Sequence, residues 1–182
     1  VPLPDPVELV LAAHFSTIRE SLEAAVIAMK HKPFACELMD KIILDCTKTN
    51  ITQRKNRFFI EGDPAAILMI EFRGKTKEEV EQKVEVLIED LKTDRKGYAF
   101  PKVYAPNTQS VWALRAAGLG LLSNIPGDKK AVECIEDTAV VIEDLPDYID
   151  EFAAIMAGYG QSAVYYAHAG AGEIHLRPVL NL

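Results

Sequence analysis

The sequence predicts one α+β domain, in which helices pack on one face of an antiparallel sheet. The 182 residues suit a single domain spanning 1–182, and a content of 49% hydrophobic and 26% charged residues is ordinary for a globular chain. Short apolar runs alternate with amphipathic segments, as strands and helices do. The connections are uneven in length, and one predicted pair of strands is joined only by a turn at Gly62-Asp63-Pro64, which favours antiparallel pairing.

The first half of the chain opens with a dense apolar run over residues 7–15, which predicts a buried strand. Thr17 and Glu20 then form a capping-box pattern at the start of an amphipathic helix. Residues 41–48 have a helical pattern, whereas residues 50–56 are polar and basic and are typical of a loop. Further short apolar runs predict strands over residues 34–38, 58–60 and 65–72.

The second half begins with the clearest helix. Thr76 and Glu79 form a second capping box, and the following apolar residues share one helical face, while Glu79 and Lys83 are spaced to pair outside it. A helix over 107–122 is capped by Asn107 or Thr108 and is closed by a turn ending in Pro126 and Gly127. The remaining segments predict extended chain at 98–104, strands at 135–142, 163–167 and 174–176, and a helix at 145–157.

The composition excludes several classes of protein. A net charge of −7 and a pI near 5.1 argue against nucleic-acid binding, which needs clustered cations. Residues 152–172 have the length of a membrane span, but Gly158 and Gly160 interrupt them, so we expect no transmembrane segment. No signal peptide is recognisable, and the three cysteines lack CxxC spacing, so we expect reduced thiols and a cytoplasmic protein. The chain lacks an initiator methionine, and we expect it to be a segment of a longer protein.

The strongest chemical signal is the run from His168 to His175, which surrounds Gly170 and Gly172. Seven residues would separate the two histidines by about 10.5 Å on a helix or about 23 Å on a strand, too far for easy sharing of one ion. A strand–glycine turn–strand arrangement folds the second histidine back towards the first, as a shared metal requires. A glycine turn with two incidental histidines explains the spacing equally well. Glu173 is a further candidate ligand.

Other features have two interpretations. Arg115 lies in an apolar helical stretch one turn from Trp112, so it either grips a carboxylate or covers Trp112 with its stem. Lys129 and Lys130 have the character of simple loop charges. Gly-x-Gly pairs occur at Gly118 and Gly170, but neither lies between a strand and a helix start, so we reject both as nucleotide sites.

These residues together resemble the C-terminal domain of FAD-linked oxidases of the D-lactate dehydrogenase and glycolate oxidase type. The family pattern H-x-G-x-G-N-x-H is similar to the run from His168 to His175, and its W-x-x-R helix is similar to Trp112 and Arg115. Lys130 matches the loop lysine of the family. Residues 136–140 match an E-D-x-A-V strand, and residues 37–40 match an E-x-M-D segment, so the resemblance covers most of the chain.

The resemblance implies a ferredoxin-like antiparallel sheet that caps a separate N-terminal FAD-binding domain. It implies oxidation of a small 2-hydroxy acid such as lactate or glycolate by the flavin. By analogy, His168 and His175 would hold a divalent metal (zinc, manganese or iron), and Arg115 and Lys130 would hold the substrate carboxylate. The motif glycines, Gly170 and Gly172, would lie against the cofactor.

The chain departs from the family pattern at two positions. Glu173 replaces the usual asparagine, and Arg177 stands where a substrate-contacting asparagine is often found, so we expect Arg177 to bind substrate, for example a second carboxylate. The family's carboxylate ligand would fall beyond Leu182. The run after His168 also resembles a long subfamily that carries an iron–sulfur module, and a full-length protein of this kind would be cytoplasmic or peripheral to the membrane.

Two other functions fit the residues. The first is a ferredoxin-like module that senses a small ligand or mediates assembly without catalysis. The second is a self-contained metal hydrolase that uses His168, His175 and Glu173. The first function predicts that regulation or activity is unchanged when the two histidines are lost. The second predicts that this domain binds metal when it is isolated from the rest of the protein.

Overall fold

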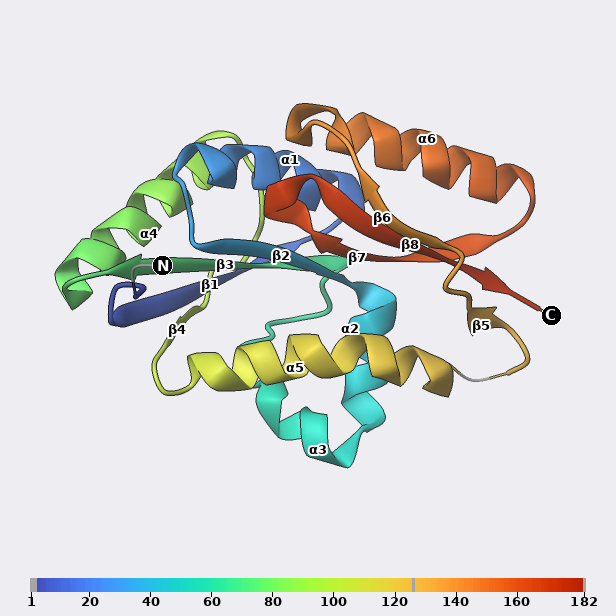
Figure 1. The fold of residues 1–182 in the computed structure, drawn as a ribbon, viewed down its shortest axis with the longest axis horizontal. Helices are drawn as coiled ribbons and strands as arrows, with labels where there is room; N and C mark the ends of the chain where they lie inside the picture. Colours follow the sequence, from blue (N-terminus) through green and yellow to red (C-terminus); the bar gives the residue numbers. More distant parts are fainter. Residues whose placement is uncertain (1–2, 126, 182) are drawn as a thin grey trace.

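An eight-stranded antiparallel sheet forms the centre of the computed structural model, which describes residues 3–125 and 127–181 (Figure 1). The strand order is β4-β1-β3-β2-β7-β8-β5, and β6 also pairs with β8. The strands are β1 (Val7–Phe15), β2 (Ala35–Asp40), β3 (Ala66–Gly74), β4 (Lys102–Tyr104), β5 (Lys130–Ala131), β6 (Ile135–Ala139), β7 (Ser162–His168) and β8 (Glu173–Leu180). The helices are α1 (Ile18–Lys30), α2 (Lys41–Thr49), α3 (Ile51–Arg54), α4 (Lys77–Thr93), α5 (Thr108–Leu121) and α6 (Leu145–Gly158).

The first four strands have a ferredoxin-like arrangement. Their chain order is β1-α1-β2-β3-α4-β4, with α2 and α3 inserted between β2 and β3, and their order in the sheet is β4-β1-β3-β2. The second half of the chain continues the same sheet, because β7 pairs with β2 through the partners Leu38–Ala167 and Met39–Tyr166. The α+β class, the antiparallel sheet and the ferredoxin-like core are therefore confirmed.

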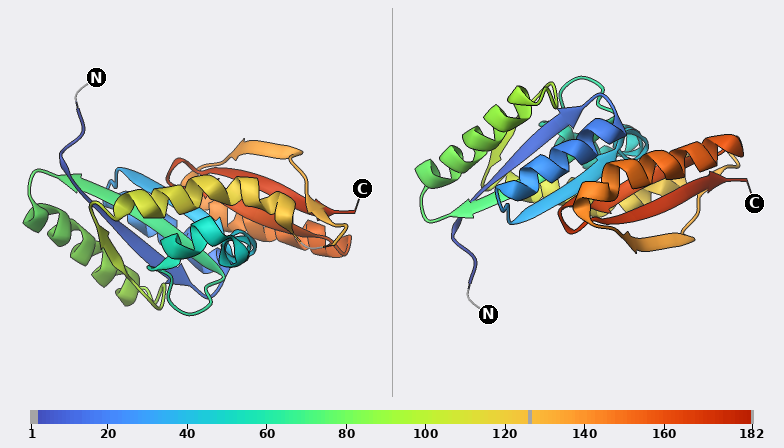
Figure 2. Two further views of the ribbon diagram at one scale, coloured as in Figure 1. Left: turned by 90° about the horizontal axis from the view of Figure 1, so that it is seen from below. Right: turned by 90° about the horizontal axis from the view of Figure 1, so that it is seen from above.

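Helices cover both faces of the sheet. Helices α1, α4 and α6 pack together on one face, as predicted (Figure 1). In addition to the prediction, α2 and α5 form a second layer on the opposite face (Figures 1 and 2). Successive residues of a strand point to opposite faces, so β1 divides its side chains between the two layers: Leu9 and Leu11 face α1 and α4, and Val10 and Ala12 face α2 and α5. Burial on both sides explains the dense apolar run that predicts this strand.

Helix starts follow the expected capping chemistry. Thr17 accepts a hydrogen bond from the backbone of Glu20, and Thr76 does the same for Glu79. The predicted pair on α4 is present, with Glu79 Oε1 2.7 Å from Lys83 Nζ. At α5, Asn107 is the cap residue but its side chain makes no capping bond. The Thr17 and Thr76 side chains satisfy backbone N–H groups that the first helical turn leaves without partners.

The segment between α2 and β3 differs from the sequence-based prediction. Residues 50–56 contain α3 and the start of a 3₁₀ turn (Lys55–Arg57) instead of a loop, because the Asn50 side chain caps a short helix at Gln53. The strand predicted at residues 58–60 is wrong. Phe59 is buried beneath α5, but the segment turns back on itself through a bond from Ile60 N to Arg57 O. Apolar residues that anchor a turn imitate a short strand in the sequence.

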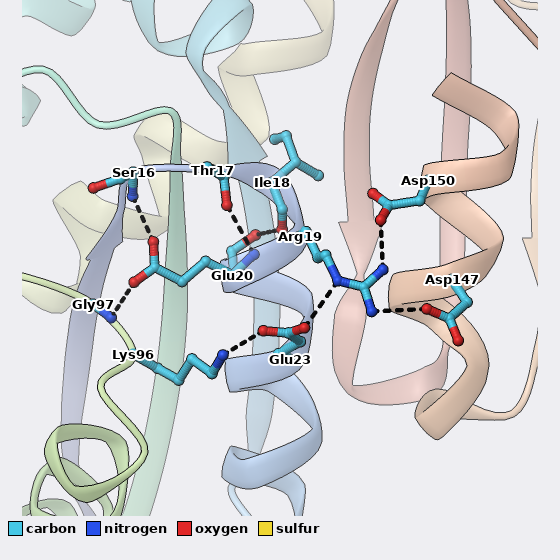
Figure 3. Close-up of polar contacts among 11 residues, drawn as sticks. Ser16, Thr17, Ile18, Arg19, Glu20, Glu23, Lys96, Gly97, Asp147 and Asp150 are labelled. Atoms are coloured by element: carbon cyan, nitrogen blue, oxygen red, sulfur yellow. Dashed lines mark hydrogen bonds and ion pairs between the residues drawn. The ribbon is translucent and has the colours of Figure 1, made fainter. Parts of the chain in front are cut away.

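A polar network joins α1 to α6 and so links the two halves of the molecule on the α1 face. The Arg19 guanidinium pairs with Asp147 at 2.8 Å, Asp150 at 2.5 Å and Glu23 at 2.9 Å (Figure 3). These groups are largely exposed, so the network orients the helices more than it stabilises the fold. Among the described residues, no helix is long and apolar enough to cross a bilayer.

The turn between β7 and β8 requires glycine at position 172, and a substitution there tests this requirement. Gly172 has φ +68°, and a Cβ atom there would lie 2.2 Å from the carbonyl oxygen of Val140. Gly160 has nearly the same φ, +65°, but has open space around it. We expect Gly172→Ala to lower the free energy of unfolding by roughly 2–5 kcal/mol and Gly160→Ala by roughly 1–2 kcal/mol, because only the first adds a steric clash to left-handed strain. Equal losses in urea denaturation would contradict this.

Asp40 gives the fold a pH dependence. Its carboxylate caps α2 at Ile43 N (3.0 Å) and also accepts a bond from Tyr165 N (2.9 Å), and burial raises its pKa to about 7. In the unfolded chain the same group ionises near pH 3.8, so the folded state holds the extra proton between these values.

We therefore expect the free energy of unfolding to fall as pH rises from about 4 to about 7, by up to about 1.4 kcal/mol per pH unit. Asp40→Asn has no proton to lose and should lack this decline, although it is less stable at low pH because one acceptor is lost. Urea denaturation across this range measures the difference, with Asp5→Asn as the exposed control. Parallel curves for the wild type and Asp40→Asn would refute the assignment.

Candidate active site

A tight hairpin brings the two motif histidines together. His168 ends β7, a 3₁₀ turn follows at Ala169–Ala171, and β8 returns antiparallel so that Tyr166 lies opposite His175. The imidazole ring centres of His168 and His175 are 5.6 Å apart, with the rings edge to face. The predicted strand–glycine turn–strand arrangement is therefore confirmed.

Three potential metal donors converge at this hairpin. One donor atom from each of His168, Glu173 and His175 lies within 4.8 Å of the other two. Two imidazoles and a carboxylate are the donor set of many divalent metal sites, so the residues fit such an ion chemically. His168 is half-exposed and His175 is buried, so the group opens to solvent on one side.

Arg115 reaches the site from α5. Its guanidinium pairs with Glu37 of β2, donates to the Tyr166 hydroxyl at 2.5 Å and lies 3.4 Å from His168 Nδ1. The carbon of the guanidinium is 4.2 Å from the centre of the Tyr166 ring, so Tyr166 is the aromatic ring that it stacks on. Burial raises the pKa of Tyr166, whose hydroxyl stays protonated and donates to the Arg115 carbonyl at 3.0 Å. Arg115 is thus held beside the histidines.

Arg177 lies on the other side of His175. The two residues are two positions apart on β8, so they share a face of the sheet. The Arg177 guanidinium is 3.0 Å from Glu136 and 2.8 Å from Glu133, and its side chain is only 8% exposed. Glu136 also lies 2.8 Å from His175 Nδ1. The site therefore carries an arginine next to each histidine.

One pocket is lined by His168, and another is lined by Arg177. The first, of ≈ 380 Å³, is lined by Phe34, Glu37, His168 and Glu173 among others. The second, of ≈ 390 Å³, lies between α5 and β8 and is lined by both Lys130 and Arg177. Lys130 is exposed and donates to the Ile125 carbonyl at 2.7 Å. The structure thus places Lys130 with Arg177 in the second pocket, and its predicted partnership with Arg115 stays a prediction.

The motif glycines are explained by close packing. A Cβ atom at Gly170 would lie 2.9 Å from Met29 Sδ, and one at Gly172 would meet the Val140 carbonyl. Gly118 is similar, because α5 lies close to Ile43 of α2 at that point. Each glycine therefore allows two protein segments to approach. The cofactor-binding role of Gly170 and Gly172 stays a prediction.

Sequence reasoning misses the acidic partners of the site. Glu37 and Glu136 belong to segments that the resemblance highlights, but nothing in the sequence alone shows that they contact the histidines and arginines. One signal was available for Glu37, which is charged within a strand whose neighbours, Cys36 and Leu38, are buried. A charge in such a position needs a partner.

Comparison with known proteins supports the resemblance. The family model "FAD linked oxidases, C-terminal domain" matches residues 5–182. D-2-hydroxyglutarate dehydrogenase of Pseudomonas putida is 31% identical over 99% of this chain, and that of Haemophilus influenzae is 30% identical over 89%. The chain spans 19% and 17% of the length of these two relatives.

Solved structures share the fold at low sequence identity. A substrate complex of p-cresol methylhydroxylase matches 99% of this chain and 40% of its own, with a TM-score of 0.61 and 14% identity. 4-Ethylphenol oxidase of Gulosibacter chungangensis matches 98% of this chain and 40% of its own, with the same TM-score and identity. The sequence match over nearly the whole length, and the α+β fold around the His–Gly–His hairpin, lead to one conclusion: this chain belongs to the family of FAD-linked oxidase C-terminal domains.

Proposed function

We propose that this domain forms the substrate-binding side of an FAD-dependent oxidoreductase that oxidises a small 2-hydroxy acid. The observation that carries the proposal is the convergence of His168, His175 and Glu173 beside two arginines. A 2-hydroxy acid has a hydroxyl group to be oxidised and a carboxylate next to it, so it needs a site of this mixed character.

His168, His175 and Glu173 would hold a divalent metal. When bound, such an ion acts as a Lewis acid that lowers the pKa of a coordinated hydroxyl. Glu173 replaces the family's asparagine, so it supplies a carboxylate close to the histidines. The family's further carboxylate ligand would lie outside this chain.

The arginines would bind carboxylates. Arg115 lies 3.4 Å from His168 and is held by Tyr166 and Glu37, which makes it the candidate for the carboxylate next to the hydroxyl. Arg177 lies beyond His175, so it is the candidate for a second carboxylate. Two cations flanking one histidine pair favour a dicarboxylic 2-hydroxy acid such as D-2-hydroxyglutarate, after which the relatives are named, over lactate or glycolate. Lys130 would add a cation on the Arg177 side.

The remaining parts would lie elsewhere in the full-length protein. The chain covers about a fifth of the relatives' length, which leaves room for an N-terminal FAD-binding domain and an iron–sulfur module. FAD would supply hydride acceptance, and the protein would orient the substrate towards it. The three cysteines of this chain are all free, in line with a reducing cytoplasmic location.

The first test removes the histidines. In the full-length protein, we expect His168→Ala and His175→Ala to keep flavin absorption but to slow flavin reduction by D-2-hydroxyglutarate at least about 100-fold, because each removes a ligand of the ion that polarises the hydroxyl. Anaerobic stopped-flow spectroscopy measures the rate.

His31→Ala is the matched control, because His31 pairs with Asp90 at 2.8 Å away from the histidine pair. A full-length protein without flavin absorption would contradict the proposal, as would unchanged reduction in the two variants. Metal-dependent hydrolysis by this domain alone would instead support the hydrolase alternative.

The second test concerns substrate length. We expect Arg177→Lys to raise KM for D-2-hydroxyglutarate roughly 10-fold or more while leaving KM for D-lactate nearly unchanged, because lysine cannot reproduce the fork of donors that grips a carboxylate. Arg115→Lys should raise KM for both acids. Steady-state kinetics with the two substrates decide, and an equal effect of Arg177→Lys on both would exclude its assigned role.

A further inference from the structure

Two glutamates from different strands each lie beside Nδ1 of one of the two histidines. Glu37 of β2 lies with Oε2 3.0 Å from His168 Nδ1, and the same oxygen accepts a bond from Arg115. Glu136 of β6 lies with Oε2 2.8 Å from His175 Nδ1, and its Oε1 accepts a bond from Arg177 Nε at 3.0 Å. Each carboxylate therefore joins one histidine to one arginine.

The sheet places both glutamates on the same face as the histidines. Leu38 pairs with Ala167, so the next position of this antiparallel ladder brings Glu37 beside His168. On the other side of the hairpin, the β6–β8 register shifts between Ile135 and Thr138, and Glu136 lies within this irregularity. A bulge of this kind redirects a side chain, here towards His175 and Arg177 on β8.

The contact atoms are the ones that matter for metal binding. A neutral imidazole binds a metal through one nitrogen, and a carboxylate that accepts a bond from the other nitrogen fixes the tautomer and the ring orientation. Both glutamates lie at Nδ1. The His168–Glu37 contact is a hydrogen bond of 3.1 Å, which favours the tautomer with its proton on Nδ1 and its metal-binding nitrogen at Nε2, whereas Glu136 and His175 Nδ1 form an ion-pair contact.

Burial distinguishes the Glu37 contacts from ordinary surface ion pairs. The side chains of Glu37 and Arg115 are 16% and 13% exposed, whereas those of Arg19 and Asp147 are 42% and 76% exposed. Buried charges lose hydration, so removing one partner leaves the other uncompensated. Glu37 is thus a buried link between an imidazole and a guanidinium. Glu136 is 34% exposed, but its two partners, His175 and Arg177, are 11% and 8% exposed.

We propose that Glu37 and Glu136 are positioning residues, each of which orients one metal-binding histidine and one substrate-binding arginine. The inference rests on the proposed function, because it assigns the two glutamates to the supporting layer of the same metal and substrate site. We expect the two to act independently, since they lie on opposite sides of the hairpin and their ion pairs among the described residues go to different histidines and arginines.

The test uses the full-length flavoprotein and measures Zn²⁺ affinity by competition with a chromophoric chelator, together with flavin content and melting temperature. We expect Glu37→Ala and Glu136→Ala each to weaken Zn²⁺ binding roughly 10–100-fold with unchanged flavin content. Glu37→Gln and Glu136→Gln should recover part of the affinity, because an amide oxygen can accept a bond from Nδ1–H. The control is Glu85→Gln on α4, because Glu85 pairs with Lys102 of β4, at the other end of the strand order from β8.

The outcomes separate this inference from the function on which it rests. Wild-type Zn²⁺ affinity in both alanine variants, with His168→Ala still losing the metal, would overturn the positioning role and leave the proposed function standing. A wild-type protein that binds no Zn²⁺ and whose flavin is not reduced by any 2-hydroxy acid would overturn both. If an alanine variant fails to fold, the leucine variant, which fills similar space but cannot accept a hydrogen bond, decides. Full Zn²⁺ affinity combined with a lowered melting temperature in Glu37→Leu or Glu136→Leu would show that the contact is merely structural.

Discussion

The pairing of β2 with β7 is the contact on which the rest of the molecule depends. It joins the ferredoxin-like half to the C-terminal half in one sheet. It also brings Glu37 next to His168, although the two residues are 131 positions apart in the sequence. Antiparallel strands project alternate side chains to the same face, so the register of this single seam decides what meets the hairpin. A slip by one residue would turn Glu37 towards α1 and leave His168 without its carboxylate partner.

The chemistry of the site follows from how its charges are compensated. Each histidine has a carboxylate at Nδ1, and each arginine shares that carboxylate. Sharing keeps the charges of the two arginines paired. Glu37, Glu133 and Glu136 already pair with the two arginines, so an incoming carboxylate competes with contacts that already exist.

Most of the fold is visible in the sequence because local patterns determine it. Capping residues mark α1 and α4, and apolar runs locate the buried strands. The layer formed by α2 and α5 is not visible, because an apolar run of residues does not show how many faces of a strand are covered. The hairpin could be predicted from Gly170 and Gly172, whereas Glu37 and Glu136 could not be assigned, since their contacts depend on strand pairings across 131 and 41 positions.

The lengths of the outer strands have a consequence for association with other chains. The sheet ends at β4, with three residues, on one side, and at β5 and β6, with two and five residues, on the other. Short or irregular borders expose few backbone donors and acceptors in a row, so they offer a poor template for another chain to extend the sheet by hydrogen bonding. A neighbouring domain would therefore meet this one through side chains on its faces and loops, where the histidine hairpin opens, and edge-to-edge aggregation would be disfavoured.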